Sequence, residues 1–258
     1  MVEASGQMDR EFARPVAVIQ IAGQGLRALP VGVEFVVVIA LAFGTAIASA
    51  IEWLRSGQAG SVEAMTMRPG DGMSLVALEL GATLAIATFL LVRGWTFERL
   101  DIRPSWRGSA IGIGIAVFIY ALDQLIDFGL HNAVTAGWLP TVFDPEREPK
   151  AADGLGLVRI GLAEILLMSL VNGIFEEVFV CGYVMRALSP QTGLLFAAVA
   201  SCTIRFSYHL YQGAVAWTFH AVFAVIFVAI YLVFRQLWPL MTAHVLLDVA
   251  ALVEGWYP

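Results

Sequence analysis

The chain has 258 residues, of which 59% are hydrophobic and 14% are charged, and its mean hydropathy is +0.78. Soluble domains carry about 25% charged residues, so this composition excludes an ordinary soluble domain and indicates a polytopic membrane protein. The formal net charge of -6 is spread along the chain and offers no basic patch for nucleic acid. We therefore expect an all-α fold, a transmembrane helix bundle in a lipid bilayer.

The first half of the chain predicts a polar tail and three spans. Residues 1–30 have the composition of a tail with an interfacial segment, and residues 31–258 that of a single transmembrane domain. Runs long enough to cross a bilayer, which takes about 20 residues, occur at about 31–54, 74–92 and 108–128.

Acidic residues lie toward the ends of these spans. We interpret Glu34, Glu52 and Glu79 as side chains that reach water at the interface. Asp123 and Asp127, spaced i,i+4 on one helical face, are interpreted as a solvated helix end. A functional carboxylate pair is the alternative for these two aspartates.

The loop between the second and third spans carries four arginines, at positions 93, 99, 103 and 107. The positive-inside rule places this loop in the cytoplasm. The long acidic loop at 129–153 then faces the outside, and the N-terminus is cytoplasmic.

Four further spans follow, at about 155–188, 191–210, 215–234 and 237–253, which makes about seven in all. The first of them exceeds thirty residues, too long for one upright crossing at 1.5 Å per residue. It must tilt, kink near Gly173 or protrude from the membrane, and we expect it to end at Ser189-Pro190.

Two adjacent glutamates, Glu176 and Glu177, lie inside this long apolar run. An ionised carboxylate in hydrocarbon costs at least ~2.5 kcal/mol, and two neighbours also repel each other. A helix end at the lipid headgroups would explain them, but apolar sequence continues on both sides. The pair therefore indicates a functional site.

Two later spans supply polar pairs that suit these glutamates. Arg205 and His209 are four residues apart, and so are His244 and Asp248, which puts each pair on one helical face. Because unpaired polar groups are costly in a bilayer, we expect the three pairs to form one shared site. Simple counting puts the two histidines at different depths, so sharing requires kinked helices or a deep pocket.

This residue set suits hydrolysis of a peptide bond. A glutamate with a histidine can deprotonate a water molecule, and a second histidine can stabilise the oxyanion. Glu176, His209 and His244 also match zinc ligands in type, with Asp248 as a fourth, although HExxH is absent. The residues therefore leave a glutamate-type site and a site with a divalent metal such as zinc both open.

Other polar residues receive simpler interpretations. Asn172, one turn before Glu176, is expected to orient it by a hydrogen bond. Glu164 is offset from Glu176 by about 120° on an ideal helix and is interpreted as structural. Cys181 is interpreted as a small buried residue rather than a nucleophile, and His220 as structural rather than cavity-lining.

The three motifs resemble the CAAX protease and bacteriocin-processing family, also called the Abi family, of multi-helix intramembrane endopeptidases. Its pattern is EExxxR, then FxxxH, then HxxxN or HxxxD, on three spans. Glu176-Glu177, His209 and His244 with Asp248 match in this order, and the similarity covers about 155–253.

The resemblance implies roles for these residues. Glu176 and His209 would activate the water with support from Glu177, and His244 and Asp248 would stabilise the oxyanion or complete a metal site. It also implies a membrane-associated protein or peptide substrate, not necessarily prenylated, and a bacterial plasma membrane.

Two departures from the pattern bear on activity. Cys181 replaces the motif arginine, and Arg205 stands at the FxxxH phenylalanine position. We expect Arg205 to supply the positive charge that Cys181 lacks. A non-catalytic membrane scaffold is one alternative function, and a proton- or ion-coupled transporter is another, although repeated halves with broken helices are not evident.

Overall fold

A computed structural model describes residues 25–147 and 160–254, which fold into helices joined by turns. The predicted all-α class is confirmed. Most of the predicted tail, at 1–24, and the first residues of the predicted fourth span, at 155–159, lie outside the described residues.

The main helices are α2 (Val31–Arg55), α4 (Asp71–Val92), α5 (Trp106–Thr135), α6 (Leu162–Glu176), α7 (Val184–Thr192), α8 (Leu194–Tyr208), α9 (Ala214–Phe234) and α10 (Trp238–Glu254). Shorter elements are α3 (Val62–Met65), η1 (Phe97–Leu100), η2 (Thr141–Phe143), η3 (Pro145–Arg147), η5 (Glu177–Tyr183) and η6 (Leu210–Gln212). Within the described ranges, five helical runs are long and apolar enough to cross a membrane: α2, α4, α5, α9 and the run from α6 to α7. The chain is an integral membrane protein. Two of the seven predicted spans correspond to the shorter helices α8 and α10, of 15 and 17 residues.

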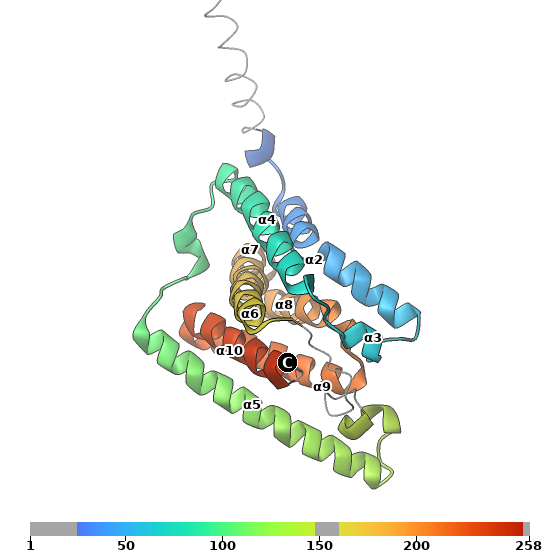
Figure 1. The fold of residues 1–258 in the computed structure, drawn as a ribbon. Helices are drawn as coiled ribbons and strands as arrows, with labels where there is room; N and C mark the ends of the chain where they lie inside the picture. The colour runs from blue at the N-terminus through green and yellow to red at the C-terminus, as the bar shows by residue number, and fades with distance from the viewer. Residues whose placement is uncertain (1–24, 148–159, 255–258) are drawn as a thin grey trace, which may run out of the picture.

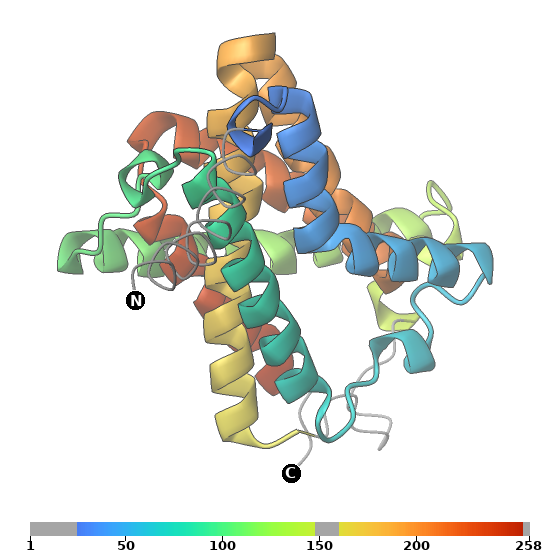
Figure 2. The same cartoon turned by 90° about the horizontal axis from the view of Figure 1, so that it is seen from above.

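A continuous rod made of α6, η5 and α7 runs through the centre of the bundle, with α4 alongside it (Figure 2). Of the three alternatives for the long span, the kink near Gly173 does not occur: α6 passes this glycine unbroken, and the helix widens into a π-helical turn only at η5. The predicted end at Ser189-Pro190 is also wrong. Pro190 lies inside α7, and the helix ends only where Gly193 adopts a φ of 88°, a left-handed conformation that favours glycine.

Glycines bring α10 close to the helices on both of its sides, α5 and α6 (Figure 1). A Cβ added at Gly112 of α5 would lie 2.6 Å from the Pro239 carbonyl oxygen. One added at Gly173 of α6 would lie 2.9 Å from the Val245 backbone nitrogen. Small residues let membrane helices approach in this way, and here they bring His244 against the carboxylates at the end of α6.

The glutamates predicted at span ends have different surroundings. Glu52 is exposed, as predicted. Glu34 is buried, so its prediction is wrong: Arg93 Nε lies 2.6 Å from its Oε2 and neutralises it, and Trp95 donates to its Oε1. Glu164 accepts a hydrogen bond from the Met73 backbone nitrogen (3.0 Å) at the start of α4, which confirms its structural interpretation.

Candidate active site

The two adjacent glutamates lie where the central rod changes from α-helix to π-helix. Glu176 ends α6 and is 6% exposed, and Glu177 begins η5 and is fully buried. Neighbouring residues of an α-helix point about 100° apart, so the two carboxylates have different surroundings. Wide helical turns of this kind frequently occur at functional sites.

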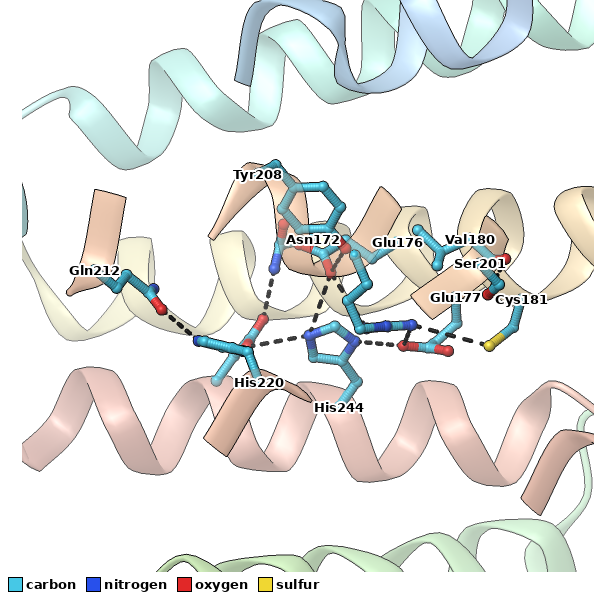
Figure 3. Close-up of polar contacts among 12 residues, drawn as sticks. Asn172, Glu176, Glu177, Val180, Cys181, Ser201, Tyr208, Gln212, His220 and His244 are labelled. Carbon is cyan, nitrogen blue, oxygen red and sulfur yellow. Dashed lines mark hydrogen bonds and ion pairs between the residues drawn. The ribbon is translucent and has the colours of Figure 1, made fainter. Parts of the chain in front are cut away.

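Arg205 of α8 is the cationic partner of both glutamates. Its Nη2 lies 2.7 Å from Glu177 Oε1, and its Nη1 lies 3.4 Å from Glu176 Oε2. The same Nη2 lies 3.9 Å from the Cys181 sulfur, so the guanidinium occupies the space beside the cysteine (Figure 3). One turn earlier on α8, Ser201 donates to the carbonyl of Val180 in the π-helical turn (2.8 Å), which holds the two segments together.

His244 of α10 lies among three carboxylates. Its Nδ1 is 2.7 Å from Glu177 Oε1, and its Nε2 is 3.4 Å from Asp248 Oδ1 and 3.8 Å from Glu176 Oε2. Both ring nitrogens therefore face acceptors, which suits the doubly protonated ring, in which both donate. Arg205 and a protonated His244 would together offset much of the negative charge of the three carboxylates.

The expected bond from Asn172 to Glu176 is absent from the described contacts, so this prediction is wrong. Asn172 Nδ2 instead donates to Asp248 Oδ2 (2.8 Å), because the close packing at Gly173 brings α10 within reach of its amide (Figure 3). Asn172 thus positions the aspartate that faces His244.

Tyr208 is a site residue that the sequence argument missed. Its hydroxyl donates to Glu176 Oε2 at 2.5 Å, and its side chain is buried (Figure 3). Tyr208 follows Arg205 by three residues on α8, which places both on one helical face. The three-residue spacing from Arg205 is the sequence feature that could have identified Tyr208 as a site residue.

His209 stands apart from this cluster. It follows the last residue of α8, and its ring stacks on His220 with centroids 3.7 Å apart and an interplanar angle of 6°. Among the described residues, its Nδ1 has no hydrogen-bond partner and neither ring nitrogen bonds a glutamate. His220 in turn contacts the side chain of Gln212 (Figure 3).

A cavity of about 290 Å³ is lined by some of these groups, among them Glu176, Tyr208 and His209. Its walls come from α2, α4, α6, α8, η6 and α10, and its polar lining includes Glu79, Asn172, Glu176, Tyr208, His209, Tyr211, Gln212 and Asp248. The interpretation of Glu79 as interfacial is therefore wrong: it is 3% exposed and faces the same cavity as Glu176, because α4 packs directly on α6.

A second cavity, of about 310 Å³, lies on the other side of the histidines. His209 and Asp248 line both cavities, whereas His220 and His244 line only the second. The second cavity thus brings together His209 and His244, the two predicted histidines that simple counting placed at different depths. His220 lines a cavity, contrary to its structural interpretation. Half-buried Asp123 and Asp127 line this second cavity as well.

Residues 159–250 match the family of type II CAAX prenyl endopeptidases described as Rce1-like. The chain carries an Rce1-like domain. The match confirms the predicted family, and the domain contains every member of the cluster from Asn172 to Asp248. The matched residues are less than half of the chain, and α2, α4 and α5 lie outside them. No curated protein and no solved structure matches the chain.

The predicted metal ligands within the Rce1-like domain do not fit a metal centre as they are arranged. In residues 25–147 and 160–254, no group of three or more His, Cys, Asp or Glu side chains is placed to hold a metal ion. Both nitrogens of His244 face carboxylates, and His209 stands beside His220. Dependence on a metal stays a prediction.

At the family level, the Rce1-like domain supports a membrane endopeptidase that acts on membrane-associated proteins. The family match leaves the catalytic type open and does not assign the catalytic residues.

Proposed function

We propose that this protein hydrolyses peptide bonds of membrane-associated proteins or peptides with a water molecule activated by Glu176. The observation that carries the proposal is the different exposure of the two glutamates. Glu176 lines the cavity, whereas Glu177 is fully buried between Arg205 and His244. A general base must reach its water, and of the pair only Glu176 lines this cavity.

The contacts of Glu176 leave one carboxylate oxygen available. Its Oε2 accepts from Tyr208 (2.5 Å) and lies 3.4 Å from Arg205. Its Oε1 receives no hydrogen bond from the described residues. This oxygen would take a proton from the water as the water attacks the carbonyl carbon. Glu176 would then give the proton to the leaving nitrogen as the C–N bond breaks, which balances the protons.

The histidines would act on either side of this step. His209 lines the same cavity as Glu176 and is the proposed partner in activating the water. His244 Nε2, 3.8 Å from Glu176, is the proposed donor to the oxyanion. Asp248 and Glu177 are acceptors, so they cannot stabilise an oxyanion directly. We assign them to holding the His244 ring in place.

The test is cleavage of a membrane-tethered peptide library by the purified protein in lipid vesicles. Glu176→Gln should lower kcat by about 10²–10⁴-fold, the usual contribution of a general base, and His209→Ala should also lower it. Glu63→Gln, which changes an exposed glutamate on α3, should leave it unchanged. Cleavage by Glu176→Gln at the wild-type rate would contradict the assignment.

The same variants separate the alternative functions. Proton flux that Glu176→Gln abolishes, without any cleaved product, would indicate a transporter. Absence of cleavage by the folded protein, together with normal function of Glu176→Gln in cells, would indicate a scaffold.

A further inference from the structure

Glu79 of α4 is a buried carboxyl group that the proposed reaction does not use. It is 3% exposed, and its Oε2 has no hydrogen-bond partner among the described residues. A carboxyl group in such surroundings is costly unless it is paired. Glu34 of α2 is equally buried, at 3%, yet Arg93, Trp95 and Tyr183 all contact it. Among the described residues, Glu79 has no comparable set of hydrogen-bonding or ionic partners.

The cavity that Glu79 lines has an acidic character. Its other ionisable lining residues in the described chain include Glu176, Asp248 and His209, and neither lysine nor arginine is among them. Glu176 and Asp248 have protein donors, from Tyr208 and from Asn172. Glu79 is thus the carboxyl group of this cavity for which the described residues supply no donor.

The position of Glu79 relative to Glu176 is set by direct packing of α4 on α6. Glu164 of α6 reinforces this packing, because its Oε1 accepts from the Met73 backbone nitrogen at the start of α4. A cavity of about 290 Å³ is close to the lower limit of about 300 Å³ for ligand pockets, so it is large enough for a substrate side chain. A peptide whose scissile bond lies at Glu176 would therefore bring a neighbouring side chain to Glu79.

We propose that Glu79 determines specificity by binding a basic side chain, lysine or arginine, next to the scissile bond of the substrate. This inference rests on the proposed function, since it concerns the substrate of that site. An ammonium or guanidinium group offers donors and a positive charge together, and charged pairs of this kind make the stronger hydrogen bonds. The acidic lining also favours a cation over a neutral or acidic residue. An apolar residue would leave Glu79 without a partner.

The experiment compares membrane-tethered peptides that differ in one residue, lysine or the uncharged norleucine, placed in turn at each position near the cleaved bond. Binding is measured with the peptide bond N-methylated, so that affinity is read without turnover, and cleavage is measured in parallel. The wild-type protein should bind the best lysine peptide at least about tenfold more tightly, since hydrogen bonds to charged groups contribute about 1.5–3 kcal/mol.

Three variants make the assignment specific. Glu79→Gln, which keeps the shape and removes the charge, should bind both peptides equally. Glu79→Asp should retain part of the preference, and Glu63→Gln, at an exposed position, should retain all of it. Equal binding of lysine and norleucine peptides by the wild type at every position would overturn the proposal, and so would a preference that survives in Glu79→Gln.

The two readouts keep this inference apart from the proposed function. Preferential binding that is lost in Glu79→Gln, without any cleavage, would support the role of Glu79 and contradict the hydrolase. Cleavage without preference would do the opposite. The wild-type comparison requires no variant, so equal binding of the two peptides overturns the proposal even if Glu79→Gln fails to fold. The Glu79→Asp variant then tests the assignment to this residue.

Discussion

The position of Arg205 leads to a prediction about paired substitutions. In the pattern of the CAAX protease family, an arginine stands where this chain has Cys181, and a phenylalanine stands at position 205. Here the Arg205 guanidinium is fully buried, 2.7 Å from Glu177, 3.4 Å from Glu176 and 3.9 Å from the Cys181 sulfur. An arginine at 181 would thus begin beside the site that the guanidinium of Arg205 now occupies.

Each single substitution should be harmful. Arg205→Phe removes one partner of a buried ion pair, which costs about 3–5 kcal/mol because a charge remains buried without compensation. Cys181→Arg inserts a long side chain at a fully buried position beside an existing cation, and overpacking alone costs about 1–3 kcal/mol. The double variant restores one guanidinium beside the glutamates, so its loss should be smaller than the sum of the two.

The assay is unfolding of the four proteins in detergent micelles, analysed as a double-mutant cycle. Contacting residues typically show interaction energies of about 0.5–3 kcal/mol. We expect an interaction energy toward the upper end of this range, with the double variant more stable than the sum of the two single losses predicts. Cleavage activity should recover in parallel. A double variant whose destabilisation equals the sum of the single losses would refute the exchange of charge between the two positions.

Three further predictions concern packing, pH and metal. The added Cβ of Gly173→Ala would lie 2.9 Å from the Val245 nitrogen, so this variant should lose about 1–3 kcal/mol of stability and cleave more slowly because α10 is displaced. Gly114→Ala, whose Cβ would meet nothing within 4 Å, should change neither property. Equal effects of the two variants in unfolding and cleavage assays would contradict this prediction. The hydrogen bond from His131 lowers the pKa of Asp144. The ionised Asp144 therefore stabilises the folded protein above the unfolded-state pKa of about 4, and this stabilisation is lost as the pH falls through the lowered pKa. Measured by thermal unfolding, Asp144→Asn should lose less stability in acid than the wild type. A chelator should leave cleavage unchanged if water activation requires only Glu176 and His209, and loss of cleavage that zinc restores would instead support the metal prediction.

The sequence was sufficient to predict the helical class and most of the clustered residues. The reason is energetic, because ionisable side chains are too costly to leave unpaired in an apolar run. The contacts of Arg205 and His244 with Glu177 therefore follow from their presence. The lengths of the spans were harder to predict. The helix α8 has only 15 residues because Gly193 and Gly213, both with positive φ, frame it and the short η6 that follows.

The remaining features depend on how the helices rotate and pack. Glu79 and Glu34 look alike in the sequence, yet one faces a cavity and the other an arginine, because neighbouring helices decide what each meets. Asn172 reaches α10 instead of Glu176 only because Gly173 allows the helices to approach closely. The π-helical turn likewise lacks a local signal, although its Val180 carbonyl is held by Ser201 of another helix.

The central claim, hydrolysis by a water molecule that Glu176 activates, is tested most directly by cleavage in water enriched in oxygen-18. We predict that mass spectrometry will find one heavy oxygen in the new carboxyl terminus of the product. We also predict that this product will be lost in Glu176→Gln and retained in Glu63→Gln. Labelled product formed at the same rate by Glu176→Gln, or cleavage without incorporation of the label, would contradict the account.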